Sequence, residues 1–339
     1  MLQPAGLQDV AAPLRLLPAE HREPHEDGLA DRVEVFELAH PHRDLFVDRV
    51  LLLRHAGSVL VFLWIVFSIT TVVRMIPVET IIGAARDLAV AGRWDRAATL
   101  LDAAIAAVPE DDAARGNAAR LALAAADVAV DAGWFTGGGD EGARLSKVDE
   151  YGLDPAQRWD LEFAWLRYEY RQHLGRPDRN VRHQGERLAE TAPDERRRGW
   201  AHHYLGLITD NLFDERADAP AHYEAALARS GGDDLLRREA LRHLGDHDHE
   251  AGEHDLALSR WREATEAGAR AGAVPGTLSQ QLLLAVLARD AGDEAGAAAL
   301  AAEVARWANA IGAARTAAQA TAFLAGVDPT QPPPSPEDS

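Results

Sequence analysis

The feature that most constrains the fold of this chain is a helical hydrophobic period that recurs from Met75 onward. Apolar residues repeat at three and four positions over stretches of about 12 to 18 residues, and clusters of Gly, Pro, Asp or Asn separate the stretches. This pattern is typical of packed helices, and no alternating strand pattern competes with it. The paired stretches recur about every 38 residues, which predicts an all-α chain built as an α-solenoid.

We expect about six antiparallel helix pairs followed by a C-terminal capping helix. Each pair is a hairpin in which a short polar or glycine-containing turn joins two helices. The predicted pairs are residues 78–91 with 94–108, 112–131 with 140–150, 156–174 with 179–191, 196–212 with 217–229, 234–251 with 254–271, and 276–290 with 293–311, and the capping helix is 313–325.

Small residues at fixed places explain how the paired helices can approach each other closely. Gly92 lies at a predicted turn and Ala97 follows it in the next helix, and the same spacing returns at Gly252 and Ala257. This pattern resembles the tetratricopeptide repeat, and the resemblance covers roughly three quarters of the chain. It implies a non-enzymatic scaffold or adaptor in which the first helix of each pair lines a concave groove that binds a protein or peptide segment.

The resemblance also implies which residues face this groove. They are His203 and Asp210 in the fourth pair, and Arg242, Asp246, His249 and Glu250 in the fifth. The chain carries a net charge of -19, so we expect a neutral or basic partner and no binding to nucleic acid. No cofactor is expected: the one GxGxxG pattern, from Gly137 to Gly142, follows a helical segment instead of a strand and contains two carboxylates, and the GxxxxGK(S/T), GxSxG and HExxH motifs are absent.

Histidine supports an alternative, a metal-dependent or acid/base enzyme that uses the His, Asp and Glu residues between 202 and 255. His243 and His247 are four residues apart and Glu250 is three further on, so all three share one helix face with the spacing of metal ligands. His203 with Asp210 is a candidate acid/base pair. No nucleophile accompanies these residues, and we therefore favour the scaffold and assign no catalytic residue.

The first 74 residues do not share the repeat. Residues 56–73 are uncharged and just long enough to cross a bilayer, which would make the chain a single-pass membrane protein and a membrane-anchored assembly factor. We favour instead translation from Met75 and a cytoplasmic repeat domain over 75–327, in keeping with the absence of cysteine. Residues 328–339 lack an apolar face and are predicted to be a disordered tail.

Overall fold

A computed structural model of the chain describes residues 76–109 and 114–329, and the regular elements in these ranges are all α-helices. The predicted all-α class is therefore confirmed for this part of the chain. Within it, no helix combines the length and the apolar composition that a membrane crossing requires. The apolar segment 56–73 and the end of the predicted tail lie outside the described residues.

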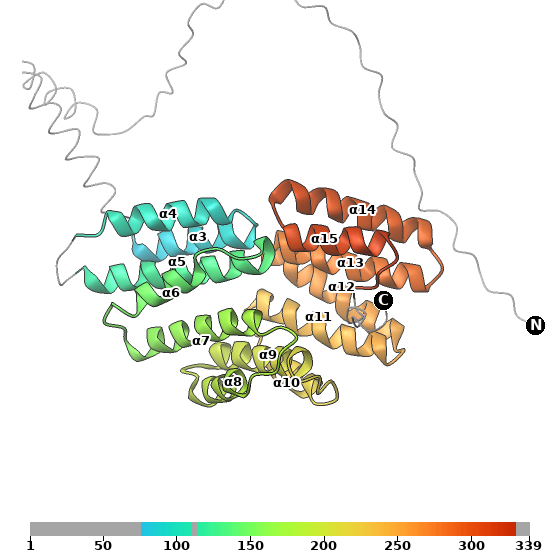
Figure 1. The fold of residues 1–339 in the computed structure, drawn as a ribbon, viewed down its shortest axis with the longest axis horizontal. Helices are drawn as coiled ribbons and strands as arrows, with labels where there is room; N and C mark the ends of the chain where they lie inside the picture. The colour runs from blue at the N-terminus through green and yellow to red at the C-terminus, as the bar shows by residue number, and fades with distance from the viewer. Residues whose placement is uncertain (1–75, 110–113, 330–339) are drawn as a thin grey trace, which may run out of the picture. The chain divides into compact units, whose positions relative to one another are not determined.

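The helices begin and end close to their predicted bounds, and they are labelled in Figure 1. They are α3 (Val78–Val90), α4 (Trp94–Ala106), α5 (Arg115–Thr136), α6 (Glu141–Val148), α7 (Pro155–Gln172), α8 (Arg179–Thr191), α9 (Glu195–Asn211), α10 (Ala219–Ala228), α11 (Asp234–Glu250), α12 (His254–Arg270), α13 (Val274–Asp290), α14 (Glu294–Ile311) and α15 (Ala314–Leu324).

Local chemistry fixes many of these helix ends. Aspartate side chains accept hydrogen bonds from backbone N–H groups at the N-termini of α7, α8, α9, α11 and α14. At the start of α7, Asp154 and Gln157 form a reciprocal capping box. Between α11 and α12, Gly252 has a φ of 78°, a conformation that residues with a Cβ rarely adopt. The predicted turn at Gly252 therefore forms as expected.

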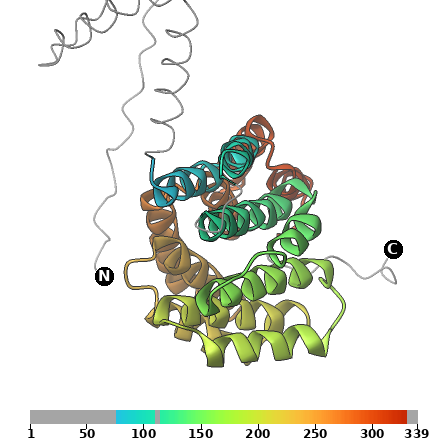
Figure 2. The ribbon, with the colours of Figure 1, turned by 90° about the vertical axis from the view of Figure 1, so that its left-hand side faces the viewer.

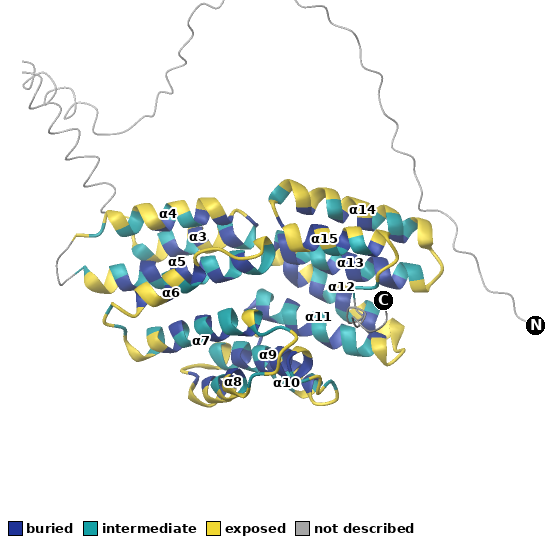
Figure 3. Ribbon diagram, viewed as in Figure 1, coloured by how far each residue is buried: buried dark blue, intermediate teal, exposed yellow. Residues whose placement is uncertain are grey.

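Most successive odd-numbered helices contact one another, and we refer to the odd-numbered helices together as the inner layer. α3 contacts α5, α5 contacts α7, α7 contacts α9, α9 contacts α11, and α13 contacts α15. Each even-numbered helix contacts the helices before and after it, and in the described ranges no two even-numbered helices contact each other to a comparable extent. Figure 3 accordingly shows exposed residues along α4 and α14. Side chains on the odd-numbered helices can therefore contact side chains from neighbouring helix pairs.

The last helix returns to the beginning of the helical unit. α15 packs on α13 and α14, as a capping helix should, and it also contacts α5 (Figure 1 and Figure 2). Ala313 and Ala317 belong to the same hydrophobic cluster as Val128 of α5. The guanidinium of Arg315 lies 4.2 Å from the ring centroid of Trp134, within the range of a cation–π contact. The first and last pairs therefore share one core.

Close helix approach depends on glycines that face aromatic rings. A Cβ built on Gly245 of α11 would lie 2.4 Å from the Trp261 ring of α12. The preceding pair repeats the arrangement, because a Cβ on Gly206 would lie 2.5 Å from the ring of Tyr223. Neither ring has measurable solvent exposure. The small residues that the sequence places in these helices are therefore required by packing.

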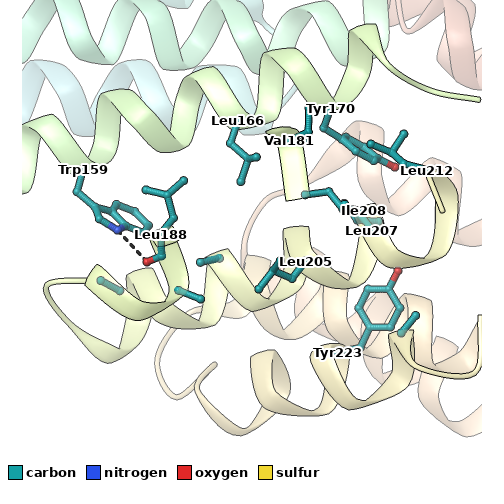
Figure 4. Close-up of a cluster of buried hydrophobic side chains, with 14 of the residues drawn as sticks. Trp159, Leu166, Tyr170, Val181, Leu188, Leu205, Leu207, Ile208, Leu212 and Tyr223 are labelled. Carbon is teal, nitrogen blue, oxygen red and sulfur yellow. Dashed lines mark hydrogen bonds between the residues drawn. The ribbon is translucent and has the colours of Figure 1, made fainter. Parts of the chain in front are cut away.

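The largest core cluster connects α7, α8, α9 and α10 (Figure 4). Trp159 is buried there, and its indole N–H donates to the carbonyl oxygen of Leu188 at 3.0 Å. The aromatic residues of α7 continue this cluster, since Phe163 stacks on Trp159 and meets Tyr204 of α9 edge to face. Aromatic side chains therefore pack between these helices, whereas small residues occupy the helix contacts of other pairs.

We predict that Gly245→Ala destabilises the protein by about 1 to 3 kcal/mol, because its methyl group would overlap the buried Trp261 ring. Gly83→Ala is the matched control, since no atom lies within 4 Å of a Cβ at this helical position. The control should leave stability unchanged or raise it by up to about 1 kcal/mol. Urea denaturation followed by circular dichroism measures both; equal effects would contradict this packing.

Candidate functional site

The candidate site lies where α9 and α11 meet in the inner layer. Six of the nine buried polar side-chain atoms without a hydrogen-bond partner in the described part of the chain lie on these two helices, among them His203 Nδ1, Arg238 Nε and Asp246 Oδ1, and the other three belong to Arg182 and Gln280. Leaving such an atom unpaired costs about 1 to 3 kcal/mol. An arrangement of this kind is expected at a functional site rather than in a core selected for stability alone.

Asp210 of α9 is the centre of a hydrogen-bond network. Its carboxylate is buried and accepts hydrogen bonds from Arg216 at 2.9 Å and from the Tyr223 hydroxyl at 3.2 Å. His247 Nε2 of α11 lies 3.2 Å from the same carboxylate. Arg216 also donates to Glu250 at 2.9 Å, so the network connects α9 to the end of α11.

Arg242 and Asp246 lie one turn apart on α11, with 3.5 Å between Arg242 Nη1 and Asp246 Oδ2. Their side chains are 22% and 20% exposed, although one carboxylate oxygen of Asp246, Oδ1, is buried. Burial raises the pKa of Asp246 to about 6, and the charges of Arg242 and His247 oppose this shift. The pair can therefore offer both a donor and an acceptor to a bound group.

His203 is almost fully buried, with 3% of its surface exposed. Its ring lies against Trp200 and Tyr204 of its own helix, and 5.5 Å from the ring of His243 on α11. Burial, together with the charges of Arg238 and Arg242, lowers the pKa of His203 to about 3. The pKa of His243 is lowered for the same main reason. Both imidazoles are therefore neutral at pH 7.

The structure brings most of the predicted groove residues together. Asp210, Asp246 and Glu250 all lie around Arg216, whose guanidinium binds Asp210 and Glu250 directly. His249 is the exception, because its Nε2 lies 2.7 Å from Asp290 Oδ2 and its side chain thus faces α13. His203 and Asp210 are both buried on α9, but each has other neighbours and no hydrogen bond joins them in the described contacts.

The predicted metal spacing gives a different grouping in three dimensions. His243, His247 and Glu250 separate, since His247 pairs with Asp210 and Glu250 with Arg216. His243 instead lies with His203 and Glu239, and the candidate ligand atoms of these three are within 4.8 Å of one another. A second such group in the described residues consists of His249, His254 and Asp290.

The sequence analysis missed an ionic network that joins α5 and α7. Arg167 donates to Asp127 at 2.5 Å and also pairs with Asp131. Burial raises the pKa of Asp131 to about 6, against the opposing charge of Arg167. These residues are separated by 36 to 40 positions, and only the contact between α5 and α7 brings them together. The sequence contains one sign of this network: charged residues occur within segments whose apolar pattern predicts packed helices.

We predict that His203 makes stability depend on pH. Its folded-state pKa lies below the unfolded value of 6.5, so the unfolded chain binds the proton first as the pH falls. This contribution is complete above pH 6.5 and is lost progressively toward pH 3. By pH 5 this loss should lower the free energy of unfolding by about 2 kcal/mol.

Urea midpoints in a chelator-containing buffer at pH 7.5 and pH 5 test this dependence. His203→Gln should lose less stability between the two pH values than the parent protein. His183→Gln, at a side chain that is 72% exposed, should behave like the parent. If His203→Gln shows the parental pH dependence, the neutral buried imidazole is not its source.

The candidate site is thus a partly exposed polar network on α9 and α11, with a pair of buried neutral histidines beside it. Comparison of the chain with family models, with curated proteins and with solved structures finds no match.

Proposed function

We propose that this protein is a non-enzymatic scaffold that holds a peptide segment on the inner layer of a tetratricopeptide-like solenoid of six helix pairs, in the cytoplasm. One observation carries the proposal: polar side chains that are held by neighbours and are partly exposed lie on three odd-numbered helices, α5, α7 and α11. Arg242 and Asp246 on α11 are the best placed of these.

Pre-ordered side chains favour this role because they lose little conformational entropy when a ligand binds. Arg242 is restrained by Asp246 and by the ring of His243, whose Nε2 lies 3.2 Å from Arg242 Nη1. Arg242 and Asp246 present hydrogen-bond partners of both kinds, which suits the alternating N–H and C=O groups of an extended peptide.

Charged groups from three other helices extend this surface. Desolvation lowers the pKa of Arg315 on α15, and the nearby positive charges of Arg242 and Arg171 lower it further. Arginines from α7, α11 and α15 are therefore close enough to influence one another. On α5, Asp127 and Asp131 supply negative charge at Arg167. We propose a neutral or basic segment as ligand, since the chain as a whole carries a charge of -19.

An acid/base enzyme has less support. Asp210 and His247 lie within hydrogen-bond distance, but Asp210 is already occupied by Arg216 and by the Tyr223 hydroxyl. A general base needs a free nitrogen or oxygen that points at a substrate proton. In this network the acceptor atoms point at protein donors, which is typical of a structural bridge between two helices.

We predict that Arg242→Glu weakens peptide binding without unfolding the protein, because it removes the guanidinium donor and places a second carboxylate beside Asp246. A peptide is first selected from a displayed library on the parent protein, and its affinity is then measured by fluorescence anisotropy. The Kd should rise at least about tenfold, equivalent to about 1.4 kcal/mol.

Arg262→Glu is the matched control, since it makes the same charge change at an exposed position on the even-numbered helix α12. It should bind the selected peptide with the parental Kd. Failure to select any peptide, or equal weakening by both variants, would contradict binding on the inner layer. Thermal melts of both variants show whether either change has unfolded the protein.

A further inference from the structure

Two histidines and a glutamate meet between α9 and α11. One candidate ligand atom from each of His203, Glu239 and His243 lies within 4.8 Å of the other two. Glu239 and His243 are four residues apart on α11, so they share one face of that helix, and His203 faces them from α9. The group therefore combines two candidate ligands from one turn of α11 with a third from α9, the corresponding helix of the preceding pair.

We propose that His203, Glu239 and His243 bind a zinc ion that joins α9 to α11. Two imidazoles and one carboxylate are a known ligand set for zinc, which leaves a fourth position for water or another donor. Nitrogen ligands of this type favour zinc over the hard ions magnesium and calcium, which prefer all-oxygen sites. The zinc site does not depend on the proposed peptide-binding function.

His203 gives an independent reason to expect a ligand. Its side chain is nine-tenths buried or more, and its Nδ1 has no hydrogen-bond partner among the described residues. A buried nitrogen of this kind is normally paired, because water is no longer available to it. Coordination of a metal by one ring nitrogen is one way in which a protein uses a buried histidine that it does not hydrogen-bond.

Aromatic rings hold the two imidazoles in place. The His243 ring stacks on Tyr223 with 4.9 Å between centroids, and Trp200 meets the His203 ring edge to face at 5.7 Å. Ordered neighbours of this type limit the rotamers that each ligand can adopt. Typical zinc–nitrogen and zinc–oxygen bonds are about 2.0 to 2.2 Å, so the three ligand atoms would move closer together by small side-chain rotations.

Two arginines lie close to the proposed site, and their positive charges oppose the binding of a cation there. Arg238 pairs with Glu239, and Arg242 lies beside His243. Arg238 also donates to the carbonyl oxygen of Gly276 at 2.8 Å, so it keeps one partner when Glu239 turns to the metal. Glu239 is 28% exposed, which gives it room for that rotation. Zinc binding would therefore exchange one ion pair for another.

The second His and Asp group provides the matched control. His249 Nε2 already lies 2.7 Å from Asp290 Oδ2, and His254 and Asp290 are exposed. A site there would have fewer restraints on its ligands and one member that is already paired. His254→Gln removes a histidine from this group and leaves the proposed zinc site intact.

The test is a zinc titration of the full chain after chelator treatment, followed by isothermal titration calorimetry and native mass spectrometry. We expect one zinc ion per chain and no binding of magnesium. At zinc a hundredfold above the Kd, the melting temperature should rise by about 5 °C. His203→Gln, His243→Gln and Glu239→Gln should each weaken zinc binding at least about 100-fold, and His254→Gln should bind like the parent.

Three outcomes would overturn the proposal. They are no zinc binding by the parent, loss of binding in His254→Gln alone, and parental affinity in all three ligand variants. If a buried histidine variant fails to fold, the result for Glu239→Gln decides the test, because a substitution at this partly exposed side chain should not unfold the protein. Cobalt substitution adds a direct readout, since its visible absorption should show nitrogen coordination in the parent protein and not in His243→Gln.

Discussion

The rest of the structure depends on the close approach of α11 and α12 at Gly245. This approach places the Trp261 ring, which has no solvent exposure, directly against the α11 backbone. The Trp261 indole N–H then donates to the carbonyl oxygen of Arg242 at 2.9 Å. A bond of this kind fixes the position of α11 along its neighbour. Arg242 and Asp246 lie within one turn of Gly245 on the same helix. The packing of α11 on α12 therefore determines the positions of these two polar side chains.

A second constraint acts between the ends of the helical unit. The contact of α15 with α5 places Ala313 and Ala317 in the core of the first pairs. Repeats that touch only their nearest neighbours can bend freely, since nothing fixes the distance between the two ends. Here the shared core and the Arg315–Trp134 contact fix that distance. The positions of α5 and α15 relative to each other are consequently fixed by packing.

The helices could be predicted from the sequence because their period, turns and small residues are local signals. Gly252 and Ala257 are examples: one adopts the positive φ that a turn needs, and the other is completely buried where two helices meet. The side-chain partners could not be predicted in this way. His243 and His247 share a helix face, yet His247 turns to Asp210 and His243 to His203, because the neighbouring helix α9 selects the partner. The contact between α5 and α15 also left no local signal, since it joins segments that are nearly 200 residues apart.

The polar residues of α9 and α11 have opposite effects on stability as the pH changes. Neutral His203 contributes more to stability as the pH rises toward 6.5. Asp246 does the reverse, because its folded-state pKa of about 6 lies above the unfolded value and its ionised form is disfavoured by burial. Apolar side chains of similar volume would avoid both costs. Apolar side chains fill most of the buried contacts elsewhere in the described helices, yet the chain keeps a histidine, an arginine and an aspartate here. Under the proposed function, a ligand that provides partners for these groups would recover the lost free energy and stabilise the occupied protein over the empty one.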